Sequence, residues 1–457
     1  MISKEIATKV LEQCLVTGGD FAEIFEEDCI NNNLMLIDSK IENVLGGRTY
    51  GIGIRIFKGF NSVYAYTNDN SLESMLDTAY KAALALGRVG EEKMIVLNNC
   101  KRTTDINLIK LYPNSVDYQH KINIMKKAFK SAKDYNSEIS QVSVNYLDKE
   151  QNVLVANTEG LYTEDKRVRT RLSITSVASR GNENQTACKG FELFEDIDPE
   201  YYGREASRVA YTMLNAKNCP AGQMTVAIDN GFGGVIFHEA CGHSLEATAV
   251  AKGNSVFTDK IGEQIASSKV TAIDDGTLPN HWGSSNIDDE GIPTQRNVLI
   301  KDGILKSYMV DKLNGRRMKT DPTGSSRRQS YKFAPTSRMT NTFIAPGNDK
   351  VEDIIKSIDD GLYAKKMGGG SVNPVTGEFN FAVAEGYLVK NGEIKEAVRG
   401  ASLIGKGSEV LMNIDMVGDN LAQAQGMCGS VSGSIPTNVG QPMIRVKEIT
   451  VGGRSEE

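Results

Sequence analysis

The sequence has no stretch that approaches the ~20 uninterrupted apolar residues of a membrane-spanning helix. Residues 1–6 also lack the apolar core of a signal peptide. There is no excess of positive charge, because 52 basic residues stand against 58 acidic residues and the net charge is −6. Proteins that bind nucleic acid draw their affinity from clustered Lys and Arg. We therefore expect a cytoplasmic protein whose main partner is neither a membrane nor a nucleic acid.

Cysteine and histidine are both scarce. The seven cysteines are an odd number, they are scattered along the chain, and no export signal accompanies them. A disulfide framework is therefore not expected, and any functional cysteine should act as a thiolate. Only four histidines occur, at positions 120, 238, 243 and 281. Two histidines five residues apart are informative in such a chain.

The composition is that of an ordinary globular protein, with 40% hydrophobic and 24% charged residues in 457. This length allows two or three domains. We expect an α+β fold with an amino-terminal domain over residues 1–195 and a connecting helix and linker over residues 196–221. The remainder, residues 222–457, is predicted to form a β-rich, barrel-like domain, because its many glycines suit sharp turns and close backbone approach.

Local patterns in the amino-terminal part predict an antiparallel sheet backed by two helices. Alternation of apolar residues predicts a hairpin, with strands at 51–57 and 62–66 around a turn at 58–61. Ser71 followed by Glu73 predicts the start of a helix that ends at Gly87. The same apolar spacing predicts a second helix near 122–132 and the connecting helix near 197–217. Further strands are predicted at 139–146, 152–156, 168–176 and 186–191, separated by polar turns.

The segment from His238 to His243 carries the strongest chemical signal. Imidazoles are good zinc ligands, and a carboxylate beside a ligand, here Glu239, can accept a proton from water. Known zinc-protease motifs space their histidines four apart, whereas a spacing of five places the side chains roughly 140° apart on a regular helix. Binding of one ion by both therefore requires a π-bulge, a kink or an early helix end between them. The alternative is a buried helix in which Glu239 and His243 form a polar pair and Cys241 fills space.

The chain resembles the TldD side of the TldD/PmbA family of cytoplasmic zinc metalloproteases. The resemblance covers nearly the whole chain and is carried by several short motifs in the order typical of the family, at residues 238–243, 274–277, 288–291, 338–342, 428–429 and 439–442. It implies that His238, His243 and Cys428 hold one zinc ion and that Glu239 is the catalytic base. It also implies pairing with a PmbA-like subunit or with a second copy of the chain.

The predicted function is therefore a zinc-dependent metallopeptidase that hydrolyses peptides or unfolded protein segments. Two neutral imidazoles and one thiolate leave the zinc with a net charge of about +1 and an open fourth position, as in catalytic sites. His281, Tyr387 or a backbone N–H could stabilise the oxyanion. Cys241 is an alternative thiolate ligand. A substrate bound as an added strand along a sheet edge would suit a β-rich domain, with the amino-terminal domain restricting access.

Other polar clusters support weaker hypotheses. The acidic residues at 274–275 and 288–290 could bind a second cation, although acidic residues beside glycine more often form turns. Arg327, Arg328 and Arg338 could hold the carboxylate of a peptide or could belong to a solvated basic loop. Two other functions are considered: a non-catalytic regulatory protein, a role once attached to this family in connection with DNA gyrase, and a zinc hydrolase of small amides.

Overall fold

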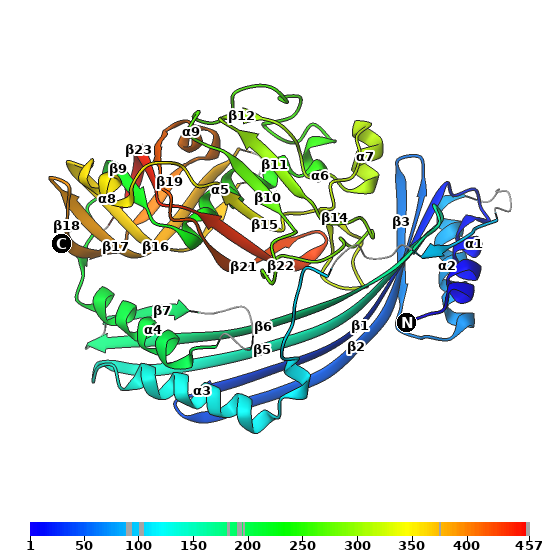
Figure 1. The fold of residues 1–457 in the computed structure, drawn as a ribbon, viewed down its shortest axis with the longest axis horizontal. Helices are drawn as coiled ribbons and strands as arrows, with labels where there is room; N and C mark the ends of the chain where they lie inside the picture. Colours follow the sequence, from blue (N-terminus) through cyan, green and yellow to red (C-terminus); the bar gives the residue numbers. More distant parts are fainter. Residues whose placement is uncertain are drawn as a thin grey trace.

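A long curved sheet forms the amino-terminal part of the protein, and a second β-rich body lies along it (Figure 1). The computed structural model describes residues 1–87, 94–99, 105–180, 183–189, 194, 197–373 and 376–453. The amino-terminal sheet has the strand order β3-β2-β1-β5-β6-β4, and β7 pairs with β6. Its strands are β1 (Phe21–Ile37), β2 (Lys40–Lys58), β3 (Asn61–Thr67), β4 (Asn98–Asn99), β5 (Ile139–Asn157), β6 (Leu161–Arg180) and β7 (Glu183–Lys189).

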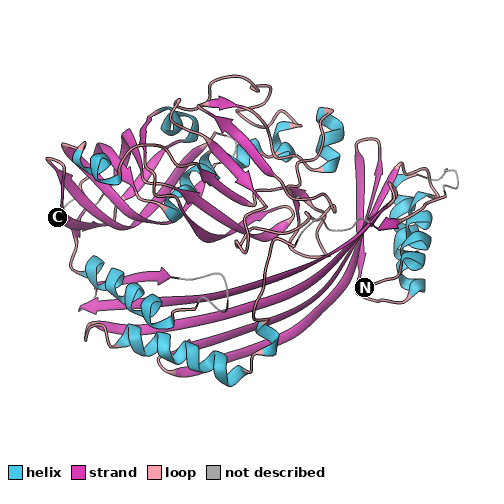
Figure 2. Cartoon of the chain, in the orientation of Figure 1, coloured by secondary structure: helices cyan, strands magenta, loops and turns pink. Residues whose placement is uncertain are grey.

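Two pairs of helices cover this sheet, one pair near each end (Figures 1 and 2). They are α1 (Lys4–Leu15) with α2 (Leu72–Leu86) and α3 (Tyr118–Lys133) with α4 (Pro199–Leu214), and the short 3₁₀ turn η1 (Pro113–Ser115) precedes α3. Each helix begins at a Ser or Asp whose side chain accepts a backbone N–H of the first turn. Each pair encloses its own hydrophobic core against the sheet. Each end of the long strands is therefore covered by a hydrophobic core of its own.

Several predicted elements of the amino-terminal part are confirmed. Residues 52–58 pair with residues 61–67 around the predicted turn, and Ser71 caps α2, which ends before Gly87. The predicted connecting helix corresponds to α4, which packs on α3 and β6 as part of the helical cover. The sheet therefore has four helices among the described residues and not two. The strand predicted at 186–191 corresponds to β7, although residues 190 and 191 lie outside the described ranges.

The predicted turn between residues 146 and 152 is wrong. Residues 139–157 form one continuous strand, β5, paired with β1 on one side and β6 on the other. The polar residues that suggested a turn have partners inside the protein. Asp148 is completely buried and accepts hydrogen bonds from Lys121 Nζ at 2.6 Å and from Asn32 Nδ2 at 2.7 Å. Because its carboxylate is paired inside the protein, Asp148 can occupy the middle of a buried strand and does not mark a turn.

The second body contains a closed barrel, as predicted. Five strands follow one another in the order β16-β9-β23-β19-β17, and the pairing of β16 with β17 closes the ring. Outside the ring lie β8 (Lys217–Asn218), β18 and β20. The bounds of these strands are β9 (Gly222–Ile228), β16 (Asp360–Val372), β17 (Glu378–Lys390), β18 (Glu393–Arg399), β19 (Ser402–Lys406), β20 (Ile414–Val417) and β23 (Ile444–Gly452).

A six-stranded sheet lies beside the barrel, in the order β12-β11-β10-β15-β22-β21. Its strands, with the pair β13-β14, are β10 (Ala272–Asp275), β11 (Arg296–Lys301), β12 (Ile304–Leu305), β13 (Ser326–Arg327), β14 (Thr336–Ser337), β15 (Asn341–Ile344), β21 (Ala422–Ser430) and β22 (Gly433–Gln441). The helical segments of this body are η3 (Gly231–Gly234), α5 (Val235–Ala240), η4 (Gly242–Leu245), α6 (Ala247–Val250), α7 (Lys312–Met318), α8 (Val351–Lys356) and α9 (Gly407–Met412). No helix in the described ranges is long and apolar enough to cross a membrane.

Buried ion pairs join the long sheet to the second body. Arg55 on β2 pairs with Glu23 on β1 and with Glu290, and Arg328 Nη2 lies 2.7 Å from Glu23 Oε1. All four side chains are at most 2% exposed. Burial of such charges requires close partners of opposite sign. These pairs therefore hold the second body in one position on the sheet.

Candidate metal centre

The helix that carries His238 ends before it reaches His243. α5 stops at Ala240, Cys241 has φ −131° and ψ −45°, and the chain continues as the 3₁₀ turn η4. A Cβ atom at Gly242 would overlap the sulfur of the buried Met339, so any larger residue here would force that side chain to move. The break brings the two imidazole rings to a centroid distance of 5.2 Å, almost perpendicular to each other. The predicted early helix end is confirmed.

Strand β21 brings a cysteine to these two rings. The Sγ atom of Cys428 lies 3.2 Å from Nε2 of His238 and 3.2 Å from Nε2 of His243. The three atoms are within 4.8 Å of one another, and within the described residues this is the one group of three or more His, Cys, Asp or Glu side chains that could hold a metal ion. His238 is 3% exposed and Cys428 4% exposed. A helix, a 3₁₀ turn and a strand thus meet at a single buried point.

Two carboxylates flank His243 on different sides. Glu239 Oε2 lies 3.6 Å from its Nε2, and 28% of the Glu239 side chain is exposed. Glu246 Oε1 lies 3.1 Å from its Nδ1, and only 7% of the Glu246 side chain is exposed. Glu239 is therefore beside the candidate ligand atoms and open to water. Glu246 is buried behind the ring, where a carboxylate can fix the tautomer of a metal-binding histidine.

The local charges favour a thiolate at Cys428. Burial raises the pKa of this thiol, but the charges of His238 and His243 and their hydrogen bonds to the sulfur lower it to about 4. Burial lowers the pKa of His243, whereas Glu246 and Cys428 together raise it well above its ordinary value. The thiolate is the form of cysteine that binds metals. The site therefore favours an anionic sulfur beside a protonated His243, and a metal ion that binds there would displace the proton from that imidazole.

Comparison with known proteins assigns the chain to a family. Sequence models of the PmbA/TldA metallopeptidases match residues 22–83 (domain 1), 111–214 (central domain) and 221–453 (C-terminal domain). The chain belongs to this family. A metalloprotease TldD homolog from Buchnera aphidicola is 38% identical over 421 residues, which is 88% of this chain and 86% of the relative. The resemblance and the enzyme class predicted from the sequence, a metalloprotease, are confirmed.

Solved structures share the fold. A candidate modulator of a DNA gyrase from Thermotoga maritima has a TM-score of 0.79 and 22% identity, and the match covers 94% of this chain and 96% of that one. TldE from Thermococcus kodakarensis has a TM-score of 0.76 and 20% identity, with 98% and 99% covered. The α+β fold with a barrel-like second body is thus common to these proteins.

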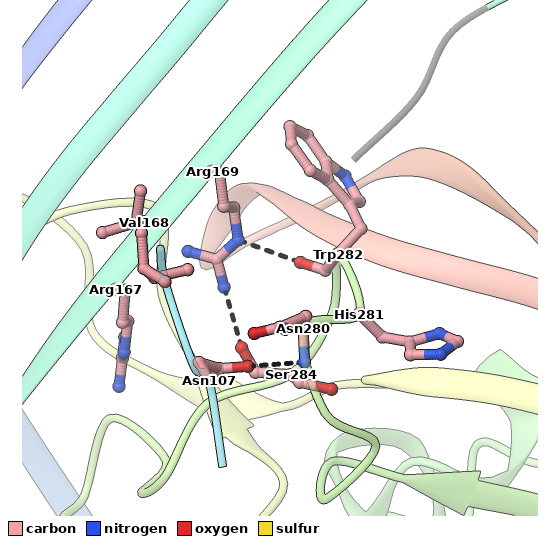
Figure 3. Close-up of a pocket in the computed structure, with 9 residues that line it drawn as sticks. Asn107, Arg167, Val168, Arg169, Asn280, His281, Trp282 and Ser284 are labelled. Atoms are coloured by element: carbon pink, nitrogen blue, oxygen red, sulfur yellow. Dashed lines mark hydrogen bonds between the residues drawn. The ribbon is translucent and has the colours of Figure 1, made fainter. Parts of the chain in front are cut away.

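Three residues considered from the sequence lie elsewhere. Cys241 is completely buried in the hydrophobic core, and burial raises the pKa of its thiol. His281, which is labelled in Figure 3, is half-buried. Its Nδ1 lies 2.8 Å from Gln423 Oε1. The hydroxyl of Tyr387 donates to Glu385 at 2.7 Å. Among the described contacts, none of the three touches the group of His238, His243 and Cys428.

The aspartates of the acidic motifs at 274–275 and 288–290 accept hydrogen bonds from other residues of the protein. Asp274 is completely buried and accepts hydrogen bonds from Thr340 and Thr342. Asp288 accepts backbone N–H groups at Glu290, Ile292 and Ser326. Neither belongs to a group of potential metal ligands within the described residues. These two carboxylates hold turns and neighbouring strands within the second body.

The expectation of a solvated basic loop is wrong, because Arg327, Arg328 and Arg338 are all buried. Arg327 donates to the carbonyl of Met339 at 2.7 Å, and Arg328 pairs with Glu23. The terminal guanidinium nitrogens of all three side chains donate hydrogen bonds within the fold. Surface arginines and buried arginines look alike in sequence, since only the folded chain places a distant carbonyl or carboxylate beside them.

Residues that line a small cavity beside β6 connect the long sheet to the second body (Figure 3). Arg169 on β6 donates to the carbonyls of Trp282 at 2.9 Å and Ser284 at 3.3 Å. Trp282 in turn donates its indole N–H to the carbonyl of Gly426 on β21 at 2.9 Å. The long sheet is thereby linked through one loop to the strand that carries Cys428.

Sequence reasoning missed Glu246 and the contact that Arg338 makes with the site. Glu246 lies three residues after His243, a spacing that brings side chains together on a helical turn, and this was the available signal. Arg338 lies within the motif at 338–342, but nothing local indicates that its guanidinium reaches Cys428.

Proposed function

We propose that this metalloprotease is a zinc-dependent peptidase in which His238, His243 and Cys428 hold one zinc ion and Glu239 is the general base. The observation that carries the proposal is the distance of 3.2 Å from the Cys428 sulfur to Nε2 of each histidine, with the Glu239 carboxylate 3.6 Å from one of these nitrogens. Such proximity of three zinc-type donors and one solvent-accessible carboxylate is the arrangement of a hydrolytic site.

The donor set fits zinc. Zinc favours imidazole nitrogen and thiolate sulfur, and three protein ligands leave a fourth position open in catalytic sites. When bound, zinc would supply Lewis acidity, which polarises a peptide carbonyl and lowers the pKa of water to about 7. The buried setting of His238 and Cys428 would restrict access to this position to the side where Glu239 is exposed.

Glu239 is suited to move a proton. Its carboxylate is part of the site yet exposed enough to meet a water molecule and a substrate. It would accept the proton of the attacking water and deliver it to the leaving amine. Glu246 is the less suitable base, because it is 7% exposed and lies against Nδ1 on the far side of His243.

The outer edge of β21 suits an extended peptide. On β22, the backbone N–H of Asn438 donates to the carbonyl of Thr340 and so points towards β15. Backbone groups alternate in direction along a strand, so those of the preceding residue, Thr437, point towards β21, where Thr437 pairs with Gly426. Met427 and Gly429, which flank Cys428, therefore direct their backbone groups away from β22. In the described part of the chain β21 is the last strand of its sheet, and Met427 is 51% exposed. A peptide added here would lie beside the ligands, and main-chain pairing would tolerate many side chains.

The wider organisation stays a prediction. We propose that residues 1–195 restrict access of folded proteins to residues 222–457, and that residues 196–221 connect the two. The long sheet lies along the second body, which supports this role (Figure 1). Pairing with a PmbA-like subunit or with a second copy, and a cytoplasmic location, follow from the same resemblance.

Metal analysis combined with a cleavage assay tests the proposal. Purified protein should contain one zinc per chain and should cut a flexible peptide, and a chelator should abolish cleavage until zinc is restored. Glu239→Gln should keep the zinc and lose most hydrolysis, because an amide cannot accept the proton. Protein without zinc would favour the regulatory role. Cleavage of small amides alone would favour the small-amide hydrolase.

A further inference from the structure

One buried arginine contacts the hairpin that carries Cys428. Arg338 is 0% exposed and lies between β14 and β15. Its Nη2 donates to the carbonyl oxygen of Cys428 at 2.7 Å, and its Nη1 donates to Ser432 Oγ at 3.0 Å and to the carbonyl of Gly433 at 3.1 Å. The guanidinium thus spans both strands of the hairpin at its closed end and fixes the backbone from which the thiol projects.

The third nitrogen of the same guanidinium faces the other half of the site. Arg338 Nε lies 3.7 Å from Glu246 Oε1. The same oxygen lies 3.1 Å from Nδ1 of His243. Nε has no hydrogen-bond partner among the described residues. The buried carboxylate of Glu246 therefore lies between the imidazole that it orients and the cation that offsets its charge.

We propose that Arg338 is a positioning residue that ties the two halves of the metal centre together. Through Glu246 it holds His243 with its Nδ1–H bonded and its Nε2 free to ligate, and through the Cys428 carbonyl it holds the thiolate opposite. These two ligands are 185 residues apart in the chain, so the guanidinium supplies a short connection that the sequence lacks. The inference depends on the proposed function, because it supposes that His243 and Cys428 bind the same ion.

The chemistry requires arginine. A planar guanidinium offers five N–H donors in a fixed fork, whereas a lysine ammonium is a single point with three rotatable donors. A lysine at this position can satisfy the hairpin carbonyls or face Glu246, but it cannot hold both groups in one plane. Loss of such outer contacts typically lowers metal affinity about 10- to 100-fold.

The test compares Arg338→Lys with Arg327→Lys. Arg327 is also buried and donates to Met339 and Thr437, and among the described contacts it touches neither His243 nor Cys428. Both variants should lose thermal stability. Only Arg338→Lys should bind Zn²⁺ roughly 10- to 100-fold more weakly in competition with a chromophoric chelator. The Co²⁺-substituted Arg338→Lys protein should also show altered sulfur-to-metal and d–d absorption bands, which a general loss of stability would not change.

A double-mutant cycle tests the connection through Glu246. Glu246→Gln keeps an oxygen acceptor for His243 but removes the charge that faces Arg338, so its effect on Zn²⁺ affinity should be smaller than that of Glu246→Ala. Combining Glu246→Gln with Arg338→Lys should cost less than the product of the two single effects, because both changes act on one contact. Glu246→Ala alone gives the result if Arg338→Lys does not fold, since it should weaken Zn²⁺ binding to a similar extent.

Wild-type Zn²⁺ affinity and an unchanged Co²⁺ spectrum in Arg338→Lys would overturn the inference, as would wild-type affinity in Glu246→Ala. Strictly independent effects in the cycle would overturn the proposed connection through Glu246. A wild-type protein that binds no zinc at all would contradict the proposed function instead, and the two failures are thereby distinguished.

Discussion

At the scale of single residues, the two cysteines nearest the histidines have different environments. Cys428 comes from a distant strand, yet its sulfur lies 3.2 Å from both imidazoles. Cys241 lies between the histidines in sequence, yet it is completely buried in the hydrophobic core. Proximity in sequence therefore does not predict which thiol lies beside the imidazoles, because the end of α5 turns the Cys241 side chain into the core.

Cys428→Ala should strip zinc from the protein and abolish peptide hydrolysis, because two imidazoles alone hold the ion weakly. Cys241→Ala is the matched control. It removes one buried sulfur, so it should cost about 1 kcal/mol of stability while zinc and activity remain. Elemental analysis and urea unfolding of both variants provide the measurement. If zinc instead follows Cys241, the ligand assignment is wrong.

At the scale of elements, the backbone of neighbouring segments lies unusually close to both ends of α5. A Cβ atom at Gly234 would overlap the backbone of Gly440 on β22, and one at Gly407 would overlap the carbonyl of Ala240 at the end of α5. These glycines let the short helix lie against both the barrel side and the six-stranded sheet. The position of His238 therefore depends on residues that carry no side chain.

Gly407→Ala should displace the end of α5 and destabilise the protein by about 1 to 3 kcal/mol, since the added methyl meets backbone that cannot rotate away. Zinc affinity should fall as well, because Ala240 lies two residues after His238. Gly369→Ala on barrel strand β16 is the control, because a Cβ there meets nothing within 4 Å. Equal urea midpoints and equal zinc affinity for the two variants would contradict this account of the helix position.

Elements with a local signal were predictable, and elements decided by distant partners were not. The hairpin around residues 58–61 and the helix capped by Ser71 follow from periodicity and capping. The continuity of β5 does not, because Asp148 resembles a turn residue until Lys121 from α3 is placed beside it. The early end of α5 was predictable only by assuming that His238 and His243 share an ion, since the five-residue spacing alone has a structural alternative.

At the scale of the whole molecule, a second ion cluster joins the helical cover to the barrel. Glu205 and Arg208 on α4 pair with each other, Arg208 also binds Glu385 on β17, and Lys366 on β16 binds Glu205 at 2.7 Å. Burial raises the pKa of Glu205, but the hydrogen bonds and charges of Arg208 and Lys366 lower it to about 2. Folding therefore favours the ionised form of Glu205.

This shift predicts how stability depends on pH. Because the pKa of Glu205 falls from 4.5 to about 2 on folding, its contribution is present above pH 4.5 and is lost as the pH falls towards 2. Because water reaches Glu205 and its partner Arg208 and screens their charges, the contribution is well below the roughly 3 kcal/mol that the shift alone corresponds to. The difference in unfolding free energy between the wild type and Glu205→Gln should shrink over this pH range. A difference that stays constant from pH 6 to pH 3 would show that Glu205 titrates normally.

The proposed ligand set was the least predictable part from residues alone. The motif at 238–243 indicates two ligands and a base, but the third ligand came from resemblance to the family. Glu246 and Arg338 act through contacts that exist only after β21, β15 and η4 have met. The sequence around a charged residue does not indicate which distant residue it will contact in the fold. For this reason, the sequence alone suggested that Arg338 contacts a substrate carboxylate or solvent.

X-ray absorption at the zinc K-edge of the purified protein tests the central claim most directly. The account predicts one sulfur at about 2.3 Å and two imidazole nitrogens at about 2.0 to 2.1 Å, with a light atom in the remaining position. The sulfur contribution should disappear in any zinc that Cys428→Ala retains and should persist in Cys241→Ala. A zinc shell without sulfur in the wild type, or with two sulfurs, would contradict the proposed centre.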